Sequence, residues 1–186
     1  LNRQIGSSFA DGTSTSTTYA GCGASRKTSE ADQAGNTTSF GYDALGRLIR
    51  VIDALGGQTT FTYDEVSNKL TQTDPNGHTT SWAYDNIGRA TRRILPLGMS
   101  EIFTYTASGN VMTKTDFNGN KITYSYDAMN RLVLKHYADA SQVTYTYTPT
   151  GQKVSISDFR GVTSHTYDLR DRLISATNPD SSTIYY

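Results

Sequence analysis

The sequence predicts an all-β fold of tandem antiparallel β-hairpin repeats, each about 21 residues long, joined into an elongated, curved or spiralling sheet. Three observations lead to this prediction. Tyrosine recurs at a fixed interval, each interval contains two turn signals, and the residues before each tyrosine alternate in character. A fixed period of roughly 20 to 50 residues is typical of repeat proteins, and two turns in each period imply two strands.

The composition agrees with strands and turns. The 186 residues include 13 Tyr and 16 Gly, and only 35% are hydrophobic. The mean hydropathy is −0.52. Such a chain favours turns and half-buried strands over a thick aliphatic core. Low hydrophobicity is also typical of disorder, but disordered chains have few aromatic residues and no regular pattern, so we reject a disordered chain.

Charge and cysteine content exclude several classes of function. The 17 Lys and Arg balance 17 Asp and Glu, so we expect no nucleic-acid partner. No apolar run reaches about 18 residues, so we expect no membrane insertion, and residues 1–11 lack the form of a signal peptide. Cys22 is the single cysteine, which excludes an intrachain disulfide and a cysteine-based zinc site. The leucine at position 1 indicates a fragment of a longer protein.

Tyrosine sets the period. It stands at equal intervals from Tyr42 through Tyr63 to Tyr147, and Tyr167 follows one position early. Asp follows five of these seven tyrosines, a turn residue lies four positions after each, and Arg or an amide residue comes next. We assign a structural role to this repeat signature, which consists of Tyr42, Asp43, Gly46, Arg47, Tyr63, Asp64, Tyr84, Asp85, Gly88, Arg89, Tyr105, Gly109, Tyr126, Asp127, Arg131, Tyr147, Gly151, Tyr167, Asp168 and Arg172.

Each turn signal has a physical basis. An Asp or Asn side chain accepts hydrogen bonds from nearby backbone amides, and Gly or Asn adopts the positive φ that closes a hairpin. A second turn signal lies eleven positions after the tyrosine, with a small residue three positions later. Its first residues are Asp53, Asp74, Asp116, Asp158 and Asn178. The period then fits two strands of about six residues and two turns of about four.

The predicted strands carry a repeated aromatic pair. In the strand 59–63, which ends at a key tyrosine, residues two apart share one face of the sheet. A ring also stands two positions before each key tyrosine, for example Phe61, Trp82 and His165. The return strands, such as 48–52 and 132–136, are rich in apolar and β-branched residues. We expect the rings to stack across strands and stabilise the sheet by about 0.2 to 1 kcal/mol per pair.

Residues 1–31 follow the pattern less well. Tyr19 and Gly23 keep the spacing of four, but the interval from Tyr19 to Tyr42 is two positions longer than the regular period. We interpret residues 1–31 as a degenerate repeat, with a two-residue insertion, or as an N-terminal connecting segment. Residues 32–186 then hold about seven repeats.

The motifs point to a family. The cleanest copies read YDALGRL from residue 42, YDNIGR from residue 84 and YDAMNRL from residue 126. They resemble the YD repeats of rearrangement-hotspot (Rhs) proteins over roughly residues 32–186. Similar repeats occur in bacterial polymorphic toxins, insecticidal toxin-complex proteins and teneurins.

The resemblance implies a function. Family members build hollow shells, which hold a C-terminal effector polypeptide in the toxins and form part of an adhesion ectodomain in teneurins. We therefore expect a shell segment that encloses or presents another polypeptide, secreted or on a bacterial cell surface, with neighbouring repeats and the effector as partners. The run from Asp74 to Gly77 resembles part of the toxins' self-cleavage motif, but it occupies an ordinary second turn.

We expect no enzyme activity, cofactor or metal site in this chain. His78, His136 and His165 occupy different repeat positions, and no catalytic motif appears. A calcium site needs six to eight converging oxygens, whereas the second turns supply one carboxylate per period. We interpret Arg47 and its counterparts as turn caps or partners of Asp, not as a row that binds acidic groups.

Two further predictions concern binding. Sugars stack on exposed aromatic rings, so the alternative function is an adhesion or carbohydrate-binding module, with Trp82 as the candidate glycan contact. Open sheet edges seek new strands, so we also expect the isolated chain to self-associate through its edges.

Overall fold

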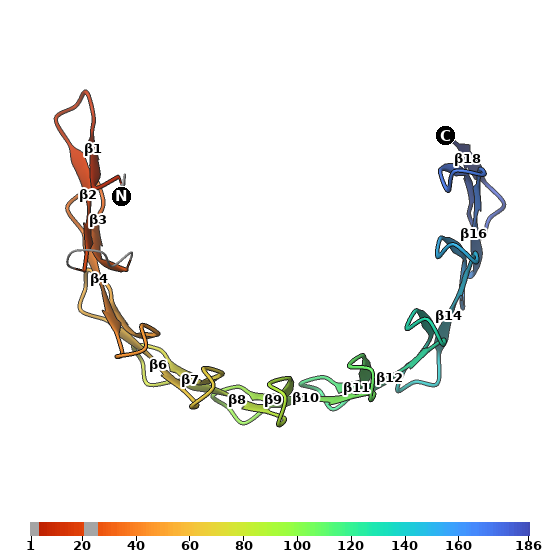
Figure 1. Ribbon diagram of the computed structural model, residues 1–186, viewed down its shortest axis with the longest axis horizontal. Helices are drawn as coiled ribbons and strands as arrows, with labels where there is room; N and C mark the ends of the chain where they lie inside the picture. The colour runs from red at the N-terminus through yellow and green to blue at the C-terminus, as the bar shows by residue number, and fades with distance from the viewer. Residues whose placement is uncertain (1–3, 21–25) are drawn as a thin grey trace. The chain divides into compact units, whose positions relative to one another are not determined.

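The computed structural model describes residues 4–20 and 26–186 and confirms the all-β prediction. Cys22 and Gly23 lie outside the described residues. The described residues form antiparallel β-strands and no helix, so no helix long and apolar enough to cross a membrane occurs among them. The chain divides into two compact units, Leu1–Gly98 and Met99–Tyr186. Within each unit the strands follow one another in chain order as a single layer (Figure 1).

The first unit contains strands β1 to β9. Each strand pairs antiparallel with its neighbour in sequence. Their bounds are β1 Gly6–Ser8, β2 Ser14–Tyr19, β3 Lys27–Ala31, β4 Thr37–Tyr42, β5 Leu48–Ile52, β6 Gln58–Tyr63, β7 Lys69–Thr73, β8 Thr79–Tyr84 and β9 Ala90–Ile94.

The second unit contains strands β10 to β18, paired in the same way. Their bounds are β10 Ser100–Tyr105, β11 Val111–Thr115, β12 Lys121–Tyr126, β13 Leu132–His136, β14 Gln142–Tyr147, β15 Lys153–Asp158, β16 Gly161–Tyr167, β17 Leu173–Thr177 and β18 Thr183–Tyr185.

Each key tyrosine ends a strand and coincides with a register shift. In the β6–β7 hairpin, Phe61 pairs with Gln72 and Thr62 with Thr71, but Tyr63 pairs with Lys69, so one residue of β7 has no counterpart. Such a bulge bends the strand and increases its twist. The same shift occurs at Tyr19, where β2 meets β3. The bulge therefore recurs at the tyrosine in every hairpin of this kind that is described here.

Both turns of the repeat share one geometry. In the first turn, the amide of Asp64 donates to the carbonyl of Asn68 at 3.0 Å, and the amide of Ser67 donates to Asp64 at 3.2 Å. In the second turn, the amide of Asp74 donates to the carbonyl of His78 at 3.0 Å, and the amide of Gly77 donates to the carbonyl of Asp74 at 3.0 Å. Three-residue hairpin loops of this type need a residue with positive φ, and Gly77 has φ 83°.

The sequence signal missed two of the second turns. They span Leu95–Gly98, where the amide of Gly98 donates to Leu95 at 2.8 Å, and Tyr137–Ala140, where the corresponding bond is 3.1 Å. Neither begins with Asp or Asn, and Ala140 takes φ 65° without being glycine. Gly98 has φ 84°, so the first of these turns keeps its glycine, whereas the second forms between the paired strands β13 and β14 without one.

The two irregular tyrosine intervals have local causes. The short interval before Tyr167 arises at the β15–β16 hairpin, where Asp158 pairs directly with Gly161 and only two residues form the loop. The long interval after Tyr19 arises in the first turn after β2, where the amide of Ala20 donates to the carbonyl of Arg26 at 2.9 Å. That bond spans six residues, whereas the corresponding bond of a regular first turn spans four. The two extra residues therefore lie between Ala20 and Arg26.

The sheet has no hydrophobic core of its own. Among the described residues only Ser175 is buried, at 8% exposure, and no apolar side chain is. The aromatic residues of strands β2 to β17 are half-buried, as the alternating burial of Tyr145 and Tyr147 in β14 illustrates. Stability within each unit therefore depends on contacts between adjacent strands, as in other repeat proteins.

Candidate functional site

The candidate site is the repeat signature, which the structure distributes along the strand ends and first turns. The tyrosines are the last residues of their strands, the aspartates open the turns, the glycines adopt positive φ, and the arginines close the turns. The tyrosines end strands β4, β6, β8, β10, β12, β14 and β16. The positive-φ glycines are Gly46, Gly88, Gly109 and Gly151.

Each signature aspartate holds its own turn closed. Oδ1 of Asp43 accepts the backbone amide of Arg47 at 2.9 Å, and Oδ2 accepts Nε of the same arginine at 2.6 Å. Asp85 with Arg89 and Asp127 with Arg131 repeat both bonds at 2.7 to 2.9 Å. Asp168 and Arg172 follow the same arrangement at 2.6 and 2.9 Å.

These hydrogen bonds favour the ionised carboxylate. The backbone amide of Arg89, followed by its side chain, holds the pKa of Asp85 below the ordinary value of 3.8. The backbone amide of Arg131 lowers the pKa of Asp127 in the same way. Hydrogen bonds to the charged form lower a carboxyl pKa even where burial opposes the change.

Two signature arginines, Arg47 and Arg131, also reach the next repeat, a contact that the sequence pattern did not predict. Nη1 of Arg47 donates to the carbonyl of Asp64 at 2.6 Å, and its guanidinium lies 5.0 Å from the ring centre of Tyr63. Nη1 of Arg131 donates to the carbonyl of Thr148 at 2.9 Å, and its guanidinium lies 4.8 Å from the ring centre of Tyr147. A planar guanidinium suits this combination of hydrogen bonding and stacking.

The sequence carries a signal for these arginines. Arg alternates with an amide residue at this position, from Arg47 and Asn68 to Gln152 and Arg172. Where the residue is Asn68, its side-chain amide stays within the turn and donates to Oδ2 of Asp64 at 2.8 Å. The turn-closing role is thus shared by both residue types, while the longer arginine adds the reach to a neighbour.

The signature tyrosines reach back to the preceding repeat. The hydroxyl of Tyr63 donates to the carbonyl of Leu48 at 2.8 Å, and that of Tyr126 donates to Val111 at 2.8 Å. The same bond is made by Tyr42, Tyr84, Tyr147 and Tyr167. The β5–β6 ladder ends at the pair Arg50 and Thr60. The Tyr63 hydroxyl therefore binds the carbonyl of Leu48, which lies beyond the end of that ladder.

Burial raises the pKa of three of these tyrosines, so their hydroxyls keep the proton that they donate. The three are Tyr84, Tyr126 and Tyr147. The ring and the hydroxyl therefore have separate tasks. The ring packs on the aromatic face, and the hydroxyl links two repeats.

Lysine side chains cover part of the aromatic face. Nζ of Lys69 lies 4.1 Å from the ring centre of Trp82 and 5.9 Å from that of Phe61. Nζ of Lys114 lies 5.5 Å from the ring centre of Phe103. Trp82 is half-buried, so the ammonium group occupies a position that a stacking sugar would need. The glycan contact at Trp82 remains a prediction, and it would require Lys69 to move.

The opposite face is lined by paired hydroxyl groups. Thr62 and Thr71 lie across from each other with 2.6 Å between their Oγ1 atoms, and Thr104 and Thr113 repeat this pair at 2.6 Å. Similar pairs at 2.7 Å are formed by Thr146 with Ser155 and by Thr166 with Ser175. Cross-strand threonine pairs stabilise antiparallel sheets modestly.

The histidines and second-turn aspartates do not converge. Nδ1 of His78 lies 3.1 Å from Oδ2 of Asp74 within one turn, whereas His136 lies in β13 and His165 in β16. Across residues 4–20 and 26–186, no group of three or more His, Cys, Asp or Glu side chains is placed to hold a metal ion. Asp74 opens an ordinary turn, because its amide and carbonyl make the same bonds as those of Asp53 and Asp116.

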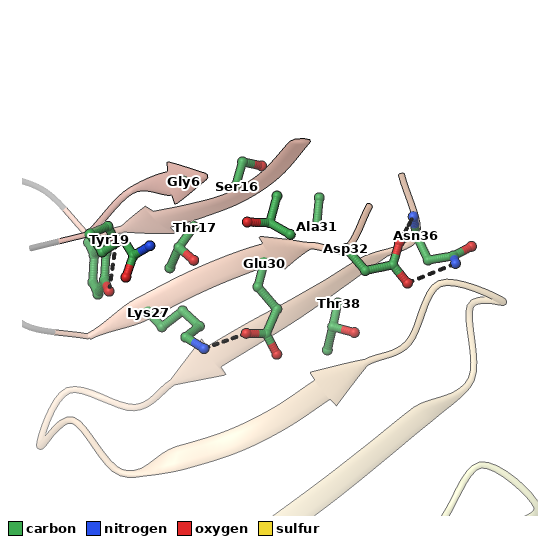
Figure 2. Close-up of a pocket in the computed structure, with 12 residues that line it drawn as sticks. Gly6, Ser16, Thr17, Tyr19, Lys27, Glu30, Ala31, Asp32, Asn36 and Thr38 are labelled. Carbon is green, nitrogen blue, oxygen red and sulfur yellow. Dashed lines mark hydrogen bonds and ion pairs between the residues drawn. The ribbon is translucent and has the colours of Figure 1, made fainter. Parts of the chain in front are cut away.

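A polar pocket lies in the first unit, at strands β1 to β4. It has a volume of about 530 Å³ and includes Thr17, Tyr19, Glu30 and Thr38 in its lining. Figure 2 shows the ion pair between Lys27 and Glu30 at its edge. We refer to it as the Thr17 pocket.

The chain is similar to known proteins in its sequence pattern and in its fold. The family model described as Teneurin YD-shell matches residues 10–183. No curated protein sequence matches the chain.

Solved structures of Tc toxin components share the fold. The crystal structure of TcdB2-TccC3-Cdc42 has a TM-score of 0.71 at 21% identity over 88% of this chain, and that of TcdB2-TccC3 has 0.70 at 22% over 88%. A TccC3-mutant Tc holotoxin pore of Photorhabdus luminescens has 0.55 at 18% over 94%. The matched region is only 10%, 11% and 13% of those chains, respectively.

Proposed function

This chain belongs to the Teneurin YD-shell family, and on that premise we propose that it forms one stretch of a protein wall that encloses another polypeptide. The wall is part of a longer Rhs-type protein, and the enclosed polypeptide is an effector, as the toxin members of the family suggest. The direct partners of the chain are then neighbouring YD repeats and the inner polypeptide.

The observation that carries the proposal is a single-layered sheet linked from repeat to repeat. No apolar side chain in the described residues is buried, so the sheet builds no core in which a small molecule would be enclosed. Instead, Tyr63 reaches back to Leu48, and Arg47 reaches forward to Asp64. A sheet whose side chains join one repeat to the next is suited to extend as a wall, since each repeat depends on the adjacent repeats for stability.

We propose that the chain catalyses no reaction. The carboxylates of the repeat signature are engaged in turns, as Asp85 is with Arg89, and a catalytic group needs a partner within hydrogen-bond reach of a reacting atom. The repetition of the signature favours structure over chemistry, because an active site requires a few special positions. We place the parent protein outside the cell or on its surface, by analogy with the family.

Protease protection in the full-length parent tests the enclosure. Under native conditions the enclosed polypeptide should resist a protease that cleaves it readily once mild denaturant has opened the wall. As a control, the same polypeptide expressed alone should be cleaved under native conditions. If the polypeptide is cleaved equally fast inside the native parent and alone, the enclosure proposal is wrong.

A further inference from the structure

The Thr17 pocket exists because one repeat lacks a ring. On the aromatic face, Phe61 of β6 lies opposite Gln72, and Gln72 lies opposite Thr80. The corresponding row in the first repeat is Thr17, Glu30 and Thr38, with the same register. The threonine at the third place is common to both rows. The first row therefore has a hydroxyl where the second has a phenyl ring.

The missing ring leaves space that is lined by polar groups. The pocket holds about 530 Å³, within the range of roughly 300 to 1,000 Å³ found for small-molecule sites. Three threonine side chains, those of Thr15, Thr17 and Thr38, line it and are half-buried. In the described part of the chain, none of their hydroxyls makes a side-chain hydrogen bond to another protein group, unlike the paired hydroxyls Thr62 and Thr71 on the other face.

The charged groups around the pocket already make contacts within the protein. Nζ of Lys27 binds Oε2 of Glu30, which leaves Oε1 as an acceptor. The side-chain amide of Asn36 donates to Oδ2 of Asp32 at 2.9 Å, and Figure 2 shows both pairs on the pocket wall. A ligand that enters therefore meets hydroxyls and two hydrogen-bonded carboxylates, that of Glu30 paired with a cation and that of Asp32 held by a neutral amide.

From this arrangement we propose that the Thr17 pocket binds a saccharide of one or two rings. Sugar hydroxyls both donate and accept, as do the hydroxyls of Thr15, Thr17 and Thr38, while Oε1 of Glu30 accepts two further hydrogen bonds. The ring of Tyr19 supplies the one aromatic surface of the lining, which suits the apolar face of a pyranose. The proposal does not depend on the wall function, and it places the carbohydrate contact away from Trp82.

Nuclear magnetic resonance titration of the 186-residue chain tests the site. The probes are the methyl β-glycosides of glucose, galactose and N-acetylglucosamine, together with cellobiose and lactose. We expect saturable shifts with a dissociation constant in the millimolar range for at least one probe, confined to amides of β1 to β4 and of the turn between β3 and β4, which together line the pocket. If no probe gives saturable shifts, or if the shifts lie outside these segments, the proposal is wrong.

Three variants test whether the saccharide binds at the Thr17 pocket. Thr17→Phe restores the ring found in the next repeats and should abolish the shifts, while Trp82→Ala should leave the affinity unchanged. Glu30→Gln keeps the side-chain shape and removes the carboxylate, so it should weaken binding about tenfold even if Thr17→Phe does not fold. Retained binding in Glu30→Gln and in folded Thr17→Phe, or lost binding in Trp82→Ala, would overturn the assignment.

Discussion

At the scale of single residues, the tyrosine of the signature does two things that phenylalanine could not do together. Its ring packs among half-buried neighbours, and its hydroxyl bonds to a backbone carbonyl of the preceding repeat, as in the pair Tyr126 and Val111. When a half-buried carbonyl loses its hydrogen-bond donor, the fold loses stability, because no neighbouring amide replaces that donor. This explains why the repeat keeps tyrosine at one position and tolerates several rings at the other.

Removing one such hydroxyl should weaken the junction between two repeats. Tyr126→Phe should lower the free energy of unfolding by about 1 kcal/mol, measured by urea denaturation of the whole chain. Tyr124→Phe is the matched control: this tyrosine is on the same strand and face, but the described contacts give its hydroxyl no hydrogen bond. Equal losses in the two variants would show that the bond to Val111 contributes nothing.

The signature aspartates should make the fold sensitive to acid. Because their folded-state pKa is lowered below 3.8, the stability that they contribute is complete above this value and is lost as the pH falls through the folded pKa. The midpoint temperature of thermal unfolding should therefore decrease once the pH is brought below about 4. In Asp85→Asn, which keeps an acceptor for the amide of Arg89, the fall should be shallower. A midpoint that rises on acidification would contradict this view of the turns.

At the scale of elements, the turns show how strand pairing can dominate local preference. Ala140 adopts φ 65° at the place where most second turns have glycine, such as Gly119 with φ 84°. A left-handed conformation costs a residue with a Cβ atom roughly 1 to 2 kcal/mol. The flanking β13–β14 pairing, in which His136 lies opposite Gln142, offsets that cost.

Replacing Ala140 by glycine should relieve the strain. We expect Ala140→Gly to raise the free energy of unfolding by up to about 1 kcal/mol, after the greater flexibility of glycine in the unfolded chain is included. Gly119→Ala, the reverse change at the equivalent turn, should lower it by about 1 kcal/mol or more. Urea denaturation measures both, and a destabilised Ala140→Gly variant would refute the strain.

Much of the hairpin pattern could be predicted because its signals are local. The tyrosine period marks the strand ends. A signature aspartate accepts a hydrogen bond from the backbone amide four residues later, as Asp43 does from Arg47, so the turn needs no distant partner.

The turn at Leu95 lacks Asp or Asn at its first position, so the second-turn signal missed it, although Pro96 and Gly98 are ordinary turn residues. The turn at Tyr137 could not be predicted, because it has neither Asp or Asn at its first position nor glycine at its fourth. It forms between the paired strands β13 and β14.

The contacts between repeats could not be predicted for a different reason. The acceptor of the Tyr63 hydroxyl is a backbone carbonyl 15 residues earlier, and its position depends on the register of two hairpins and on a bulge. Backbone carbonyls carry no sequence signal. The same limit applies to Trp82, whose exposure depends on where the flexible Lys69 side chain rests, and to the Thr17 pocket, which is visible only once Thr17 is aligned with Phe61.

At the scale of the whole molecule, the last strand of the described residues leaves one edge without a strand partner among them. Strand β18 pairs with β17 through Ala176 and Ile184, and its other edge has no strand partner in the described residues. Ile184 and Tyr185 are 53% and 78% exposed. An exposed, apolar edge strand is a template for pairing with another chain.

Edge pairing should make the isolated chain self-associate. Sedimentation velocity should show a mass that rises with concentration, and Ile184→Lys should shift the distribution toward the monomer, since charged edge strands resist pairing. Ile102→Lys, which also replaces an exposed isoleucine but in the paired strand β10, should leave the distribution unchanged. A chain that is monomeric at all concentrations would exclude edge pairing.

We propose that these repeats form part of a wall around another polypeptide, and electron cryomicroscopy of the full-length parent can test this. We expect a particle with an interior space and polypeptide density inside it. This chain's hairpins should lie side by side in the surrounding wall, with each tyrosine at a junction between repeats. A solid particle with no interior space, or a wall to which this chain does not contribute, would contradict it.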